Sequence, residues 1–229
     1  MRKALIVAID GPSGAGKSTL SKALARQLGY LNIDTGAMYR SVALAALRRR
    51  VDPADAAGLQ ALCGSIRIGF ARHADGERVL LNGEDVSNEI RTPQVSLLTA
   101  RVAASPVVRA AMVRLQREMG SQGGVVLEGR DIGTVVFPAA EVKFFLSATA
   151  RERGRRRYEE LLAKGVAVDL EQTIAEVEAR DAADTVREHA PLRRAEDAVA
   201  IDTTSLSIDQ VLQQMLQVVE ARRESCPAR

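Results

Sequence analysis

Residues 9–19 read Ile9-Asp10-Gly11-Pro12-Ser13-Gly14-Ala15-Gly16-Lys17-Ser18-Thr19 and follow directly on the apolar run Ala4–Ala8. Their glycines, lysine and serine fit the phosphate-loop pattern G-x-x-x-x-G-K-[ST]. The run in front has the composition of a buried strand, and leucines at 20, 24 and 28 give the following segment an amphipathic helical face. Strand, loop and helix in this order are the context that the pattern requires. The stretch therefore predicts a phosphate-binding loop.

The residue types in the loop explain how it would hold phosphate. Glycines allow backbone conformations closed to other residues, so that successive N–H groups can turn toward an anionic oxygen, and the helix start adds partial positive charge. Lys17 would reach the β- and γ-phosphates, and the Ser18 hydroxyl would bind Mg²⁺. An accidental glycine-rich turn is the alternative, which the flanking strand and helix disfavour. We expect the nucleotide to contact Gly11, Pro12, Ser13, Gly14, Ala15, Gly16, Lys17, Ser18 and Thr19.

Composition limits the class of protein. The chain has 229 residues, 46% of them apolar and 27% charged, as in globular proteins that bury a substantial core. A net charge of +3 does not predict nucleic-acid binding. The two cysteines and two histidines lack the spacing of a disulfide framework or a metal site. No apolar run approaches the roughly 18 residues of a membrane span, and no signal peptide is recognisable. We expect a cytoplasmic protein without nucleic-acid or membrane partners.

The remaining elements alternate between helix and strand. Continuous apolar runs predict parallel strands covered on both faces, and an antiparallel hairpin interrupts the alternation. Asp34 or Thr35 should cap one helix, and Asp52-Pro53 and Ser105-Pro106 should open two others. The pattern predicts a doubly wound α/β fold with an inserted hairpin. Strands are expected near 30–34, 66–71, 78–82, 125–127, 142–146 and 198–201, and helices near 35–50, 53–62, 93–104, 106–120, 149–163, 170–186 and 207–222, with a frayed tail after them.

A second polar stretch, Glu128-Gly129-Arg130-Asp131-Ile132-Gly133-Thr134, follows one of the buried-type strands. Ligands of open α/β sheets bind beyond the carboxyl ends of the strands. Arg130 could hold a phosphate with two parallel hydrogen bonds, and Asp131 could accept from an exocyclic amine or bind a metal. A surface turn with a local ion pair is the alternative. The stretch is thus a candidate for the acceptor side of a phosphate-transfer site.

Several blocks in a fixed order make the chain resemble the bacterial cytidylate kinase family between about residues 4 and 222. They are Asp34-Thr35-Gly36-Ala37-Met38-Tyr39-Arg40, Gly83-Glu84-Asp85-Val86 with Glu89-Ile90-Arg91-Thr92, Gly129-Arg130-Asp131-Ile132-Gly133-Thr134-Val135-Val136-Phe137-Pro138, and Arg180-Asp181 with Ala190-Pro191-Leu192. The resemblance implies a P-loop kinase of the nucleoside monophosphate type that uses ATP and Mg²⁺ to phosphorylate CMP and dCMP. It also implies one domain, with a core at about 1–62, 105–148 and 187–222, a monophosphate-binding insertion at 63–104, a helical lid at 149–186 and a tail at 223–229. We expect a monomer.

The resemblance also assigns roles to individual residues. Lys17, Arg40, Arg130 and Arg187 would be catalytic, the three arginines by holding the acceptor phosphate. The sugar would meet Asp184, Arg180 and Thr35, and the base would meet Tyr39, Arg109 and Asp131. A carboxylate facing N4 and a guanidinium facing N3 and O2 suit cytosine, whereas uracil reverses the hydrogen-bonding character of positions 3 and 4 and would mismatch buried groups by roughly 1–3 kcal/mol each.

Two positions depart from the family pattern, and the lid leaves choices open. Ala100 stands where the family often has serine, which could weaken cytosine selectivity, and Ala183 stands where it can have arginine. In the arginine-rich segment 151–157, Arg153 and Arg157 would lie on one helix face and close onto ATP, while Arg151 and Arg155 are expected to be solvated.

Two other functions remain open from sequence. A kinase relaxed toward pyrimidine monophosphates, or one for another small molecule, could use the same fold. An ATP- or GTP-dependent switch is a more remote alternative, because no guanine-reading N-K-x-D motif occurs and the acceptor arginines would have no task.

Overall fold

The computed structural model describes residues 4–73, 76–163, 165–186 and 191–225. Its internal contacts divide the chain into two compact units. The first combines residues 1–32 with 122–229, and the second comprises residues 33–121. The second unit is wider than the insertion expected at 63–104, because the helices on either side of the hairpin pack together. The assignment of the whole chain to one kinase domain stays a prediction.

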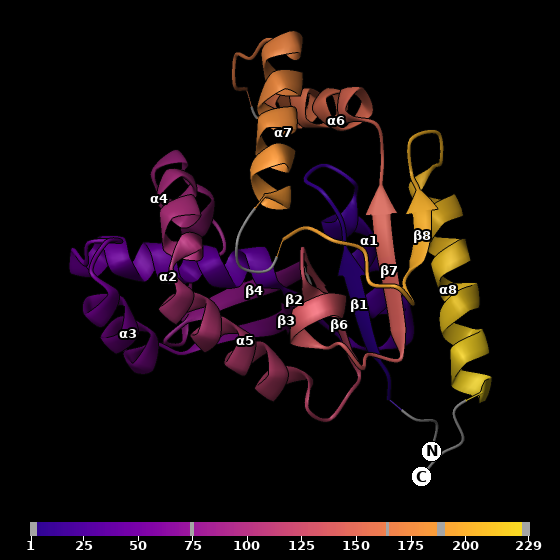
Figure 1. Cartoon of the computed structure of the whole chain (residues 1–229), viewed down its shortest axis with the longest axis horizontal. Helices are drawn as coiled ribbons and strands as arrows, with labels where there is room; N and C mark the ends of the chain where they lie inside the picture. Colours follow the sequence, from indigo (N-terminus) through magenta and orange to yellow (C-terminus); the bar gives the residue numbers. More distant parts are fainter. Residues whose placement is uncertain (1–3, 74–75, 164, 187–190, 226–229) are drawn as a thin grey trace. The chain divides into compact units, whose positions relative to one another are not determined.

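The first unit is built on a five-stranded sheet of order β2-β6-β1-β7-β8 (Figure 1). β6, β1, β7 and β8 pair in parallel, which places their carboxyl ends along one edge. The buried core contains Leu5, Val7, Ile9, Leu20, Leu24, Phe144, Val211 and Met215, so α1 and α8 pack against the sheet through their apolar faces. The strands are β1 (Ile6–Asp10), β2 (Leu31–Asp34), β6 (Val125–Gly129), β7 (Val142–Ser147) and β8 (Val199–Asp202), and the two helices are α1 (Lys17–Leu28) and α8 (Ile208–Ser225).

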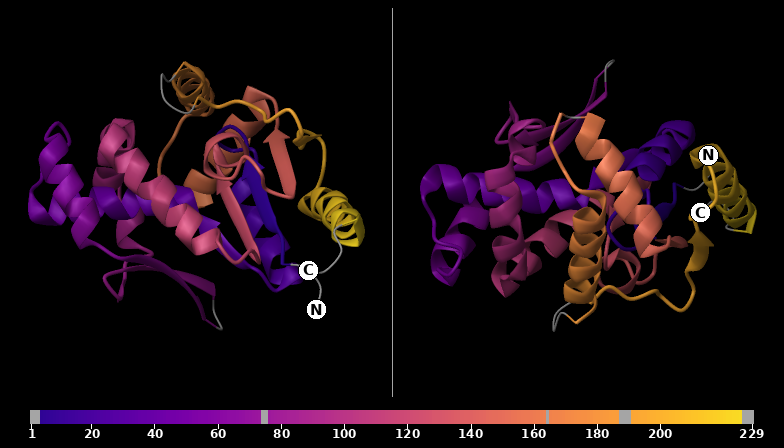
Figure 2. Two further views of the ribbon diagram at one scale, coloured as in Figure 1. Left: turned by 60° about the horizontal axis from the view of Figure 1, so that its bottom comes forward. Right: turned by 90° about the horizontal axis from the view of Figure 1, so that it is seen from above.

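Two further helices of this unit, α6 (Ala150–Ala163) and α7 (Leu170–Thr185), lie against each other (Figure 2). Their close approach depends on Gly154, where a Cβ atom would lie only 2.4 Å from Ile174 Cγ1. These helices occupy most of the segment expected to form the lid. Between β6 and β7, a short helical segment, η2 (Ile132–Val136), follows the candidate acceptor residues. No local pattern in the sequence had indicated it.

The second unit surrounds a small antiparallel sheet of order β3-β4-β5. β3 and β4 form the expected hairpin, with Ile68 opposite Leu81. Asn82 and Gly83 both have positive φ, 53° and 87°, and turn the chain into β5, a short strand that we did not predict. The elements are α2 (Thr35–Arg49), α3 (Ala56–Ser65), β3 (Ile68–His73), β4 (Gly76–Leu81), β5 (Glu84–Asp85), η1 (Glu89–Arg91), α4 (Pro93–Ala104) and α5 (Pro106–Gly120).

Helix starts show where local signals succeeded and failed. Asp34 caps α2 by accepting from the Ala37 N–H at 2.8 Å, as expected. Pro53 does not open α3, because Asp55 caps that helix instead by accepting from the Gly58 N–H. Proline does occupy the first turn of α4 and α5, although the Ser105 side chain accepts no capping bond from an N–H group of α5.

The last helix is longer than expected. α8 continues to Ser225, beyond the expected end at 222, and residues 226–229 lie outside the described part. Within the described ranges no single helix is long and apolar enough to cross a membrane; α4 and α5 pass that test only as a pair bent by 94°.

Candidate functional site

The glycine loop between β1 and α1 has the conformation that a phosphate cradle requires. Gly11, Gly14 and Gly16 have φ values of 149°, 77° and 87°, a region that side chains disfavour. A Cβ atom on Gly11 would also lie 2.1 Å from the Leu146 carbonyl oxygen of β7. α1 begins at Lys17, immediately after this loop, so its unpaired N–H groups face the same end. The loop is therefore shaped for an anion, and the residues present fit the triphosphate of ATP.

Lys17 is buried, with 6% of its surface exposed, and its Nζ donates to the Pro12 carbonyl oxygen at 2.6 Å. Burial lowers the pKa of Lys17 well below its usual value, and the positive charges of Arg130 and Arg180 lower it further, while Glu128 and Asp10 act in the opposite direction. A bound phosphate would add negative charge beside Lys17, Arg130 and Arg180 and would favour the charged form of Lys17. The electrostatics thus link the glycine loop to two of the predicted acceptor-side residues.

Arg130 lies at the carboxyl end of β6 and is held from α7. Its Nε donates to Asp184 Oδ2 at 2.9 Å, and the Asp184 side chain is only 1% exposed. Arg130 itself is 20% exposed, and its Nη1 also donates to the Gly129 carbonyl oxygen. Such a buried charge pair fixes the guanidinium direction. Residues predicted for acceptor phosphate and sugar, 54 positions apart, are therefore in contact.

Arg153 lies on α6 and contacts the glycine loop directly. Its Nη1 donates to the Ser13 carbonyl oxygen at 2.9 Å, its Nε donates to the Ala148 carbonyl oxygen, and its Nη2 pairs with Asp181 of α7. The side chain is 6% exposed. Arg157, its expected partner against ATP, is instead half-exposed and paired with Glu160. The two arginines predicted to act together thus occupy different surroundings in this structure.

A contact that sequence reasoning missed joins α6 to the glycine loop through Thr203. Arg156 donates to the hydroxyl and the carbonyl oxygen of Thr203, at 3.0 and 2.6 Å. The Thr203 hydroxyl lies 3.4 Å from the Ala15 carbonyl oxygen of the glycine loop and 3.0 Å from that of Ser147. Thr203 follows β8 and has no motif around it, so only the sheet order could reveal this contact.

The predicted residues of the second unit lie on α2 and α5. The Arg109 guanidinium stands 6.0 Å from the centre of the Tyr39 ring, the geometry of a weak cation–π contact. Arg40 donates from Nη1 to Ser96 Oγ at 3.2 Å, and Thr35 is buried with 5% exposure. Tyr39 and Arg109, both predicted to meet the base, are therefore neighbours. Arg187 lies outside the described residues, so its predicted contact with the acceptor phosphate stays a prediction.

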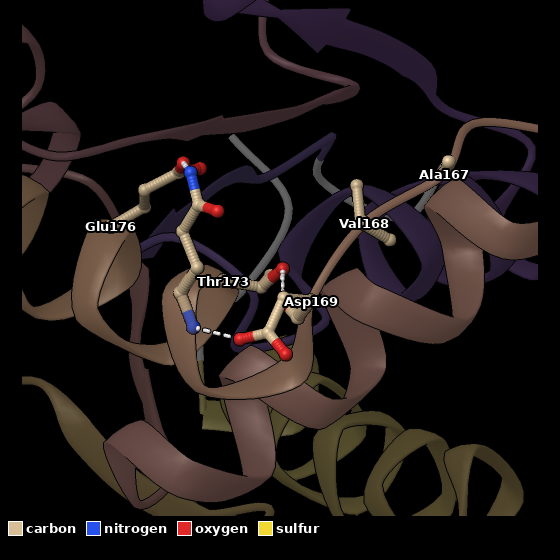
Figure 3. Close-up of a pocket in the computed structure, with 6 residues that line it drawn as sticks. Ala167, Val168, Asp169, Thr173 and Glu176 are labelled. Carbon is tan, nitrogen blue, oxygen red and sulfur yellow. Dashed lines mark hydrogen bonds between the residues drawn. The ribbon is translucent and has the colours of Figure 1, made fainter.

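Two other features do not extend the site. A pocket of about 350 Å³ at the start of α7 is lined by Ala167, Val168, Asp169, Gln172, Thr173 and Glu176 (Figure 3). None of these is basic, and Asp169 is occupied in capping the helix through the Gln172 N–H. Among the described residues no group of three or more His, Cys, Asp or Glu side chains could hold a metal ion. A cation at the loop would rely on the Ser18 hydroxyl, phosphate oxygens and water.

Comparisons with known proteins agree with this chemistry. The family described as cytidylate kinase matches residues 7–221. A cytidylate kinase of Syntrophotalea carbinolica is 69% identical over 226 residues, covering 99% of this chain and 96% of the relative. One from Geobacter sulfurreducens is 59% identical over 99% of this chain and 97% of its own length. Among solved structures, TT1252 from Thermus thermophilus covers 96% of this chain and 98% of its own with a TM-score of 0.50 and 21% identity, a likeness of fold alone.

Proposed function

The chain belongs to the cytidylate kinase family, and we infer from this premise that it transfers the γ-phosphoryl group of ATP to CMP and dCMP. The products are ADP with CDP or dCDP. The observation that supports the inference within the structure is that Arg130 directly follows Gly129 of β6, which lies opposite Asp10, the residue just before the glycine loop. Burial, and then the charges of Arg130 and Arg180, lower the pKa of Lys17 at this loop. One anion site built from backbone N–H groups and another built from guanidinium groups are what a phosphoryl transfer between two nucleotides requires.

On the donor side, we propose that Gly11 to Thr19 bind the phosphates of ATP. The positive φ values of the glycines and the buried Lys17 support this role. Mg²⁺, held by the Ser18 hydroxyl and phosphate oxygens, would supply neutralisation of the developing charge when bound. Arg153 already donates a hydrogen bond to the Ser13 carbonyl oxygen of the loop, and it would either hold the loop in this conformation or turn toward the phosphates. Arg157 would approach ATP when the lid helices close.

On the acceptor side, we propose that Arg40, Arg130 and Arg187 bind the phosphate of CMP. Asp184, Arg180 and Thr35 would contact the sugar, and the contact between Arg130 and Asp184 supports the nearness of phosphate and sugar. Tyr39, Arg109 and Asp131 would recognise the base. The position of the Arg109 guanidinium, 6.0 Å from the centre of the Tyr39 ring, is consistent with a shared surface for a planar ring.

The reaction needs no dedicated base, because the phosphate of CMP is already anionic at neutral pH. Lys17 and the arginines would align the acceptor oxygen with the γ-phosphorus and neutralise charge on the equatorial oxygens. Since Lys17 is buried and its pKa is depressed, the approach of the triphosphate would favour its charged form. Exclusion of water by the lid helices would limit hydrolysis of ATP.

A coupled assay of ADP release over CMP, dCMP, UMP, AMP and shikimate tests the function. We expect CMP and dCMP to be turned over far faster than the others. Equal rates with CMP and UMP would favour a relaxed pyrimidine kinase, and a high rate only with shikimate would favour a different small-molecule kinase. ADP release with none of the acceptors would leave the switch alternative.

We further propose that the protein acts as a cytoplasmic monomer without nucleic-acid or membrane partners. The small net charge of +3 supports the lack of nucleic-acid binding. Size-exclusion chromatography with light scattering should give the mass of one chain, 24.6 kDa. A mass of twice this value at working concentrations would refute the monomer.

A further inference from the structure

Asp10 is a buried acid to which none of the roles above assigns a task. It ends β1, where it is paired in register with Gly129 of β6, and only 4% of its surface is exposed. Its Oδ1 accepts from the Ile132 N–H at 2.8 Å, and its Oδ2 accepts from the Gly133 N–H at 2.7 Å. The residue just before the glycine loop therefore holds the backbone that follows Arg130 and Asp131.

These two N–H groups begin the helical segment η2, so no earlier turn of that segment can accept from them. The N–H groups of Val135, Val136 and Phe137 bond to Asp131 and Ile132 carbonyl oxygens within the segment. Asp131 itself makes no capping bond with its side chain. Asp10 thus supplies the cap from another strand, and the Asp131 carboxylate is not committed to that purpose.

A second buried, charged side chain lies close to the same segment. A Cβ atom on Gly133 would lie 3.1 Å from Lys143 Cδ and 3.4 Å from Asp10 Oδ2. Lys143, on β7, is 6% exposed and is itself anchored by Asp197 at 2.8 Å and by the Pro138 carbonyl oxygen. The backbone at Gly133 therefore passes close to two fixed side chains, from β1 and β7, the strands on which the site is built.

We propose that Asp10 is a positioning residue of the acceptor site. By fixing the backbone at Ile132 and Gly133, it would hold the preceding residues, Arg130 and Asp131, in place beside the glycine loop. This inference rests on the proposed function, since it concerns how the acceptor is aligned with ATP. A carboxylate suits the task because it offers two acceptors to two backbone donors. A shift of about 1 Å in such a group can cost about 100-fold in rate.

The first test compares wild type with Asp10→Asn. The amide keeps the size of the side chain but offers one acceptor, and it turns an NH₂ group toward the second N–H. We expect kcat/KM for CMP to fall about 100-fold and the ratio of CMP to UMP rates to fall about tenfold. ATP affinity, measured by calorimetry with a non-hydrolysable analogue and no acceptor, should change less than about threefold.

A second variant leaves the charge beside Lys17 intact. Gly133→Ala pushes the backbone away from Lys143 and Asp10. It should lower kcat/KM for CMP and the ratio of CMP to UMP rates as Asp10→Asn does. If Asp10→Asn fails to fold, Gly133→Ala alone tests the positioning role. Asp55→Asn is the matched control, because exposed Asp55 caps α3 through the Gly58 N–H in the same chemical way. It should leave all kinetic constants unchanged.

The outcomes separate the inference from the function on which it rests. Wild type without turnover of CMP would refute the proposed function. If wild type turns over CMP but the variants lose ATP affinity as much as they lose kcat/KM for CMP, the positioning role of Asp10 is refuted and the proposed function is not. An unchanged ratio of CMP to UMP rates in Gly133→Ala and in folded Asp10→Asn would refute it as well.

Discussion

The buried Asp10 carboxylate should make folding stability depend on pH in an unusual direction. Burial raises the pKa of Asp10 from 3.8 to about 6; the Asp131 charge adds to this, while the bonds from Gly133 and Ile132 and the charge of Lys17 oppose it. The native state then holds this proton more tightly than the unfolded chain does. The contribution of Asp10 to stability is therefore greatest below about pH 4 and is lost as the pH rises through about 6.

The size of the effect follows from the shift. A change of about two pKa units corresponds to about 3 kcal/mol between the two protonation states. Asp10→Asn removes this titration and leaves the other groups as a shared background. The free energy of unfolding of wild type, minus that of Asp10→Asn, should therefore be about 2 kcal/mol larger at pH 4 than at pH 7, since the full shift is reached only below pH 3.8.

Urea unfolding at several pH values between 4 and 7 measures this difference. The chain has no tryptophan, so far-ultraviolet circular dichroism is the suitable signal. Asp202→Asn is the control, because hydrogen bonds from Thr204 lower the pKa of exposed Asp202 below 3.8. Its contribution is lost only below this pH range, so the difference between wild type and Asp202→Asn should stay nearly constant from pH 4 to 7. Parallel curves for wild type and Asp10→Asn over this range would refute the reasoning.

Three further substitutions test the site. Arg130→Ala should lower kcat/KM for CMP by about 3 kcal/mol in transition-state terms, while calorimetry shows unchanged ATP binding; an equal loss of ATP affinity would contradict an acceptor-side role. Asp131→Asn should relax the preference for CMP over UMP by about tenfold and reduce total turnover less; steady-state rates with both acceptors measure this, and a constant ratio would exclude base recognition. Gly11→Ala should destabilise the fold by about 3 kcal/mol, because its Cβ would meet the Leu146 carbonyl oxygen at 2.1 Å. Gly29→Ala, which has positive φ but no neighbour within 4 Å, should cost about 1 kcal/mol, and equal urea midpoints for the two variants would show that the contact with Leu146 does not matter.

Some elements could be predicted because their signals are local. The loop at Gly11 to Thr19 depends on fixed spacing, and the apolar runs of β1, β6 and β7 are dictated by burial on both faces. The cap of α2 by Asp34 spans only three residues. The start of α3 was predicted wrongly because two competing signals, Asp52-Pro53 and Asp55, lie within four residues and the local rules do not rank them.

By itself the sequence determined the phosphate loop, the alternation of helices and strands, and the set of polar residues that a family of kinases shares. Only the tertiary structure decided which of these residues touch. Asp10 caps a segment 122 residues away, and Arg130 pairs with Asp184 across 54 residues. Arg153 contacts the Ser13 carbonyl oxygen, whereas Arg157 pairs with Glu160. The physical reason is that a buried charge takes its partner from the strands and helices that the sheet order brings beside it, and that order is not a local property of the chain.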